Sequence, residues 1–72
     1  MQTRRKHLRT ARRAKNWTAL ELAEQIGATE NIIYLGERGR TTPHKETALR
    51  WAAALDLPAD EAFPEIFGGV SQ

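Results

Sequence analysis

Residues 22–39 predict two short helices joined by a sharp corner, and this pair constrains the fold more than any other feature. The first helix is expected to end at Gly27, because glycine readily adopts the positive φ that a tight helix exit requires. Thr29 follows two residues later and can cap the next helix, which Gly36 and Gly39 would finish. A turn of three or four residues can hold two helices at an angle and in contact. We therefore expect the core to be built around this helix pair.

The rest of the chain predicts further helices and no strand. Helices are expected over about 3–15, 18–26, 30–35, from 43 or 44 to about 55, and over 57–63. Thr18 can cap the second of these while Glu21 reaches back to the cap, a reciprocal arrangement typical of a helix start. In the fourth, apolar residues recur at helical spacing, at Ala48, Trp51, Ala52 and Leu55. The prediction is an all-α domain of five helices.

The chain has 72 residues and no cysteine, which limits it to one small domain held together by helix packing. We expect a core over 8–63, a basic segment over 1–7 and an apolar tail over 64–72. Disulfides and thiolate metal sites are excluded. His7 and His44 are the only histidines, so the usual spacings allow neither a zinc site nor a catalytic triad. We expect no enzymatic activity, no metal and no cofactor.

No part of the sequence has the roughly 18 consecutive apolar residues that a membrane span needs. The apolar stretch of a secretory signal is also missing from the first 30 residues. We expect a cytoplasmic protein without a membrane partner.

Charge is distributed very unevenly along the chain. Residues 1–20 carry seven bases and no acid, a charge of +7, whereas residues 21–72 carry a charge of −5. This asymmetry is typical of a basic helix or arm that meets a polyanion. A solvated, charged helix face would have the same composition, so charge alone leaves both interpretations open.

The spacing of many residues resembles the lambda-repressor-like, Xre/Cro class of helix-turn-helix domains over roughly residues 8–63. The matching positions are Leu8, Arg12, Leu22, Ala23, Ile26, Gly27, Ile33, Glu37, Gly39, Pro43, Leu55, Asp60 and Glu61. The resemblance implies five helices, with the second crossing the DNA backbone and the third lying in the major groove. It also implies a partly buried ion pair between Arg12 and Glu37, which would tie the first helix to the end of the third. Arg12 as a phosphate contact is the alternative.

Residues near the N-terminus of a groove-bound helix meet base edges, so the third predicted helix supplies the candidates for base contact. These are Glu30, Asn31, Tyr34 and Leu35. Asn31 can bond to adenine, Glu30 can accept from cytosine, and Leu35 can pack on a thymine methyl. An acid at a helix start is also stabilised by the helix dipole without any ligand, and Asn31 can equally be a solvated helix-start residue. The expected phosphate-contacting residues are Lys15, Thr18, Arg38, Arg40 and the arm of Arg4, Arg5 and Lys6.

Four positions depart, in three ways, from the pattern that the resemblance implies. Gly36 stands where a large apolar core residue is usual, so either Trp51 or Trp17 fills the space or the third helix packs differently. Ile32 and Leu35 are more apolar than expected for a groove-facing surface, and they face either outward or, after a rotation of the helix, the core. Ala19 replaces an amide side chain that often bonds a phosphate.

These features together predict a small repressor-like transcriptional regulator that binds double-stranded DNA as a homodimer. The expected dimer surface comprises Phe63, Ile66, Phe67 and Val70. Two half-sites about 34 Å apart would then lie on one face of the duplex. One alternative is a protein-interaction module on the same scaffold, such as a toxin-antitoxin or phage regulatory partner. Another is binding of structured RNA through the basic first helix.

Overall fold

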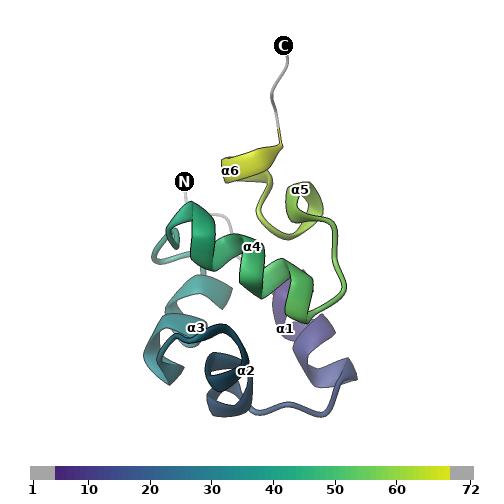
Figure 1. Ribbon diagram of the computed structural model, residues 1–72, viewed down its shortest axis with the longest axis vertical. Helices are drawn as coiled ribbons and strands as arrows, with labels where there is room; N and C mark the ends of the chain where they lie inside the picture. Colours follow the sequence, from purple (N-terminus) through teal and green to yellow (C-terminus); the bar gives the residue numbers. More distant parts are fainter. Residues whose placement is uncertain (1–4, 69–72) are drawn as a thin grey trace.

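The computed structural model describes residues 5–68. Within this range all the secondary structure elements are helices, and there is no strand. The helices are α1 (Lys6–Ala14), α2 (Ala19–Ile26), α3 (Glu30–Glu37), α4 (Lys45–Ala54), α5 (Ala59–Ala62) and α6 (Pro64–Phe67). In Figure 1, α2 and α3 lie at one end of the molecule, α4 crosses its middle, and α5 and α6 lie at the other end. The all-α class is confirmed, and α6 is a short helix beyond the five expected.

The start of α2 has the reciprocal cap that its sequence predicts. The Glu21 amide donates to the Thr18 hydroxyl at 3.1 Å, and the Thr18 amide donates to the Glu21 carboxylate at 2.8 Å. The helix ends at Gly27, whose φ of 72° lies in the left-handed region. After this corner the Thr29 hydroxyl accepts from the Ile32 amide at 3.3 Å and caps α3. The predicted starts of the two central helices are thus confirmed.

At its other end, α3 runs two residues farther than expected, through Gly36 to Glu37. Gly36 is buried inside the helix, and a Cβ added there would lie 2.5 Å from Cη2 of Trp51. The indole of Trp51 therefore occupies the space that a larger residue at position 36 would take. Of the alternatives left open by the sequence, Trp51 is the residue that fills this space, and Trp17 is half-buried where α1 leads into α2.

The core lies between α4 and the other helices. Its largest fully buried side chains are Leu8, Leu22, Ile33, Trp51 and Phe63. The four apolar residues predicted to form a stripe on α4 are all buried. Trp51 meets Phe63 edge to face, with ring centroids 5.3 Å apart. Full burial of a side chain such as that of Phe63 contributes roughly 1.5–3 kcal/mol.

The C-terminal part requires a correction to the expected dimer surface. Phe63 is fully buried in the core of its own subunit, because the chain turns at this residue between α5 and α6 and directs the ring onto Trp51. It is therefore not a surface residue. Ile66 and Phe67 on α6 are half-buried against the core, while Val70 lies outside the described residues. Pro64 is the first residue of α6.

Candidate nucleic-acid interface

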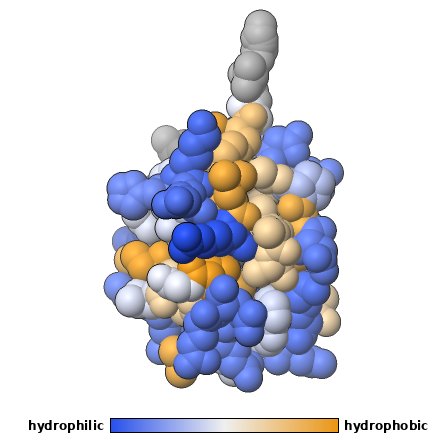
Figure 2. Space-filling model, viewed as in Figure 1, coloured by the Kyte–Doolittle hydropathy of each residue, from blue (hydrophilic) through white to orange (hydrophobic). Residues whose placement is uncertain are grey.

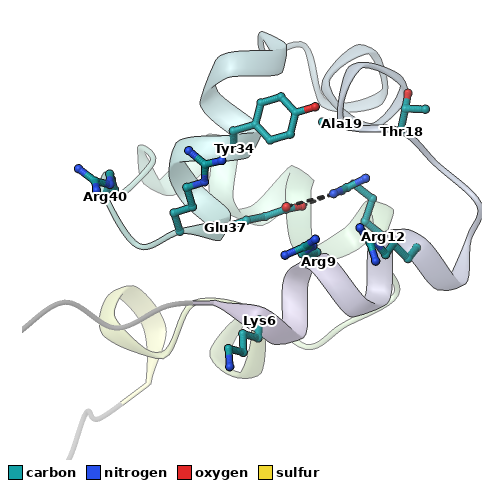
Figure 3. A pocket seen from close by; sticks show the side chains of 10 residues that line it. Lys6, Arg9, Arg12, Thr18, Ala19, Tyr34, Glu37 and Arg40 are labelled. Carbon is teal, nitrogen blue, oxygen red and sulfur yellow. Dashed lines mark hydrogen bonds and ion pairs between the residues drawn. The ribbon is translucent and has the colours of Figure 1, made fainter.

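An open hollow of about 590 Å³ lies where α1, the start of α2 and the end of α3 come together (Figure 3). It is lined by Lys6, Arg9, Arg12, Arg13, Thr18, Ala19, Tyr34, Glu37, Arg38 and Arg40. Six of these residues are basic and one is acidic, so the surface is strongly cationic. We call this site the basic hollow.

The α1 side of the basic hollow carries three exposed bases, Lys6, Arg9 and Arg13. Their spacing of three and four residues places them on one face of the helix. Arg9 and Arg13 contribute to the charge of residues 1–20 but were not among the predicted phosphate contacts. Their helical spacing was the signal that could have found them.

The floor of the basic hollow is an ion pair between α1 and α3. Arg12 donates from Nε to Glu37 Oε2 at 2.7 Å and from Nη2 to Oε1 at 3.2 Å, and its Nη1 donates to the Trp17 carbonyl at 2.9 Å. Both side chains are less than one tenth exposed, and Figure 3 draws the pair as a dashed line. Removing one partner of such a buried pair costs about 3–5 kcal/mol. The two charges offset each other, so the cationic character of the site comes from the exposed bases.

The hydrogen bond to Glu37 raises the pKa of the Arg12 guanidinium above its usual value, and burial acts in the opposite direction. A pKa raised by folding stabilises the protein at every pH below the unfolded-state pKa. The contribution of Arg12 is lost only as the pH rises through the higher folded-state pKa. Arg12 therefore stays protonated, and able to link α1 to Glu37 on α3, until strongly alkaline pH.

Along α3, the candidate base-contacting residues differ in their surroundings. Glu30, Asn31 and Tyr34 are exposed and Leu35 is half-buried. Only Tyr34 lines the basic hollow, and Figure 3 shows its ring directed towards Ala19 and Thr18 at the start of α2. Its hydroxyl donates to Glu30 at 3.4 Å.

The orientation of the two apolar residues on α3 was left open by the sequence. Ile32 packs partly against the core, whereas Leu35 is half-buried outside the core cluster. The two residues therefore neither both face outward nor both face the core, because α3 turns Ile32 inward and leaves part of Leu35 accessible.

Beyond α3, the chain turns at Gly39, whose φ is 75°. The Gly39 amide donates to the Gly36 carbonyl at 3.1 Å, and the Arg40 amide donates to the Leu35 carbonyl at 2.9 Å. This turn brings the exposed side chains of Arg38 and Arg40 to the rim of the basic hollow. They lie across the site from the bases of α1.

Two other predicted phosphate contacts are not brought to this site. Lys15 does not line it, and its ammonium lies 2.7 Å from the Asp56 carboxylate and 5.7 Å from the centre of the Trp17 ring. Arg5 requires a correction, because its side chain is only 2% exposed and is held by contacts inside the protein. A buried guanidinium with protein partners cannot reach a phosphate without breaking those contacts. Arg4 lies outside the described residues.

The described part of the chain contains neither a membrane-spanning helix nor a cluster of metal-ligating side chains. Between residues 5 and 68, no helix is long and apolar enough to cross a membrane. The same range contains no group of three or more histidine, cysteine or acidic side chains placed to hold a metal ion.

Comparison with known proteins identifies the fold. A family model described as helix-turn-helix matches residues 8–61. The chain is also similar to the restriction-modification controller protein C.AhdI from Aeromonas hydrophila, known from a high-resolution crystal structure. The two are 31% identical over 81% of this chain and 88% of that chain, with a TM-score of 0.72. No curated protein matches the sequence. Because the family model matches most of its length, the chain belongs to the lambda-repressor-like, Xre/Cro class of helix-turn-helix DNA-binding domains.

Proposed function

We propose that this protein is a transcriptional regulator that binds specific sites in double-stranded DNA, with α3 in the major groove. The observation that carries the proposal is that the exposed side of α3, through Tyr34, borders a hollow lined by two sets of bases. One set comes from α1 and the other from the turn after α3. The major groove admits an α-helix, and phosphate contacts on either side fix the helix in register.

Phosphate contacts would come from the exposed bases Lys6, Arg9, Arg13, Arg38 and Arg40, together with Thr18 at the start of α2. A helix N-terminus favours anions because its amides and dipole face them. If the five bases neutralise five phosphates per subunit, the logarithmic salt slope is about −4.5.

Base contacts would come from the exposed side of α3. Asn31 has the donor and acceptor that pair with adenine, and Leu35 can contact a thymine methyl. Glu30 accepts a hydrogen bond from the Tyr34 hydroxyl at 3.4 Å, and its carboxylate can also accept from a cytosine amino group.

A homodimer acting as a repressor on a pseudo-palindromic operator is the form of regulation that we propose. Figure 2 shows apolar atoms gathered at the α5 and α6 end of the molecule, among charged groups. Ile66 and Phe67 are the candidate contacts there. The similar C.AhdI is named as a restriction-modification controller protein, and a role as a controller fits the regulator that we propose.

The experiment that tests the proposal is selection from random duplexes, followed by binding measurements on two variants. Asn31→Ala should lower the preference for the selected site by about 1–3 kcal/mol, because it removes a base contact. Arg38→Ala should weaken binding to all duplexes about equally and flatten the salt slope by roughly one unit, because it removes a phosphate contact.

Arg50→Ala is the matched control for Arg38→Ala, since Arg50 is an exposed base on α4 that does not line the basic hollow. It should change the slope much less. Failure of the wild-type protein to retain any duplex at low ionic strength would refute DNA binding. Wild-type behaviour of both Asn31→Ala and Arg38→Ala on the selected site would refute the assignment of α3 to the groove.

The protein-interaction alternative would use the exposed residues of the third helix, and an outward apolar surface of Ile32 and Leu35 would favour it. Ile32 packs against the core, which leaves the exposed part of α3 more polar than that alternative requires. DNA binding is therefore the better-supported function.

A further inference from the structure

Arg5 is an unusual residue in so small a protein, because its charged side chain is almost completely buried. Arginine is rarely buried unless its charge is paired. Here Nη2 lies 3.0 Å from the Glu65 carboxylate on α6, and the guanidinium carbon lies 5.4 Å from the centre of the Phe63 ring. The Glu65 side chain is 34% exposed, so the counterion sits at the edge of the protein while the guanidinium lies within it.

The other contacts of Arg5 converge on the end of α3. Its amide donates to the Glu37 carbonyl at 2.9 Å, and its Nη1 donates to the Gly36 carbonyl at 2.7 Å. A second bond from Nη1 reaches the Thr41 carbonyl at 3.0 Å. A cation near the C-terminus of a helix also interacts favourably with the helix dipole. Arg5 thus contacts the chain on both sides of the turn that carries Arg38 and Arg40.

The ion pair therefore connects α6 with the turn after α3. If Glu65 loses its charge, the buried guanidinium loses its counterion, and an uncompensated buried charge is strongly unfavourable. The guanidinium can relieve this cost by moving towards solvent, which would break its bonds to Gly36 and Thr41. The geometry of that turn then depends on a carboxylate from a different helix.

We propose that Arg5 and Glu65 are positioning residues for DNA recognition, which hold the end of α3 and the following turn so that Arg38 and Arg40 meet the phosphates. The inference rests on the proposed DNA-binding function. It gives α6 a second role, because any change at Glu65 reaches the DNA-binding surface through one side chain.

Glu65→Gln tests the proposal, and the chain provides a matched control in Asp56→Asn. Each substitution removes one negative charge and one ion pair of similar length, Glu65 with Arg5 at 3.0 Å and Asp56 with Lys15 at 2.7 Å. Of the two bases in these pairs, Arg5 contacts the end of α3, whereas Lys15 contacts Asp56 and Trp17. Asparagine also tolerates the positive φ of 59° at position 56.

A pure charge effect and a positioning role through Arg5 predict opposite changes in the DNA affinity of Glu65→Gln. Loss of an acid alone makes the protein more cationic, so both variants would bind duplex DNA as well as wild type or more tightly. If Glu65 acts through Arg5, Glu65→Gln should instead bind roughly 2- to 30-fold more weakly, with a shallower salt slope, while Asp56→Asn does not. Equal or tighter binding by Glu65→Gln would overturn the proposal.

Amide hydrogen exchange provides a readout that does not require DNA. The amides of Gly39 and Arg40 bond within the turn that Arg5 supports, whereas the Ala28 amide bonds to the Ala23 carbonyl at the end of α2. Glu65→Gln should accelerate exchange at Gly39 and Arg40 relative to Ala28, and Asp56→Asn should leave this ratio unchanged. An unchanged ratio in Glu65→Gln would refute the supporting role of the pair.

Arg5→Lys separates the charge from the shape of the guanidinium. A lysine keeps the charge but lacks the planar fork that reaches several acceptors at once. It should therefore give weaker DNA binding and faster exchange of the same two amides, and wild-type values for both would refute a role for the fork. If wild-type protein binds no duplex, the proposed function and the DNA-positioning role fail together, and the exchange measurement still decides whether the pair holds the turn.

Discussion

At the scale of single residues, Gly36 and Trp51 form a close fit between α3 and α4. The indole of Trp51 lies where a Cβ on residue 36 would project, with Cη2 at 2.5 Å and Cζ3 at 2.9 Å from that position. Trp51 is itself held edge-on by Phe63, so the ring has little freedom to move away. The absence of one methyl group therefore lets α3 approach α4 at this point.

Gly36→Ala should destabilise the protein despite the better helix propensity of alanine. Propensity favours alanine by about 1 kcal/mol, whereas overpacking a fixed core costs typically 1–3 kcal/mol. We expect the overpacking to outweigh the propensity, giving a lower urea midpoint at an unchanged m-value. Trp51→Phe supplies the control, because phenylalanine lacks the ring atoms that clash. In that background Gly36→Ala should be neutral or stabilising, and a full penalty there would contradict this account.

At the scale of helices, the two starts of the helix-turn-helix are capped to different extents. At α2, Thr18 and Glu21 each satisfy one amide of the other residue. At α3, Thr29 accepts from one amide at 3.3 Å, and the residue three positions on is Ile32, which cannot return a hydrogen bond. The start of α2 is therefore the more firmly fixed.

Thr18→Ala should thus cost more stability than Thr29→Ala. Loss of a threonine cap costs about 0.5–2 kcal/mol, and the reciprocal bond at Thr18 places it towards the upper end of that range. Chemical denaturation of the two variants measures the difference directly. Equal losses would show that the bond from Glu21 adds nothing to the cap.

The parts of the fold that were predictable from sequence are those whose signals lie within a few residues of each other. The cap of Thr18 by Glu21, the corner at Gly27 and the buried stripe of α4 are local patterns, and the structure confirms them. The same locality explains why Arg9 and Arg13 could have been assigned to one helix face with Lys6.

The failures concern residues whose surroundings come from distant parts of the chain. Arg5 looked like part of a solvated basic arm, because its acceptors at Gly36, Thr41 and Glu65 lie more than thirty residues away in sequence. Phe63 was predicted to lie on the dimer surface for a similar reason, since its partner Trp51 lies on another helix. Burial of a charge or a ring depends on tertiary packing, which helical periodicity does not specify.

For the whole molecule, the main question is whether two copies associate through the α6 end. Ile66 and Phe67 are half-buried there and retain accessible apolar surface. A dimer through this face would keep α6, and with it Glu65, close to the subunit boundary.

Phe67→Ser should weaken the proposed homodimer by removing apolar area from that face. A loss of about 1.4 kcal/mol corresponds to roughly tenfold in the dissociation constant, and sedimentation over a range of concentrations measures it. Leu49→Ser is the control, because Leu49 is an exposed apolar residue on α4, 46% exposed. A wild-type protein that remains monomeric throughout, or an identical shift for both variants, would rule out this dimer face.

The two tryptophans of the chain, which are natural fluorophores, lie in contrasting surroundings. Trp51 is fully buried against Gly36 and Phe63, whereas Trp17 is half-buried beneath the ammonium of Lys15. Emission from an indole shifts to longer wavelength as water gains access to it, so Trp51 reports loss of the core while Trp17 reports changes between α1 and α2. Replacing either tryptophan by phenylalanine would let the fluorescence of the other report unfolding or DNA binding without an added dye.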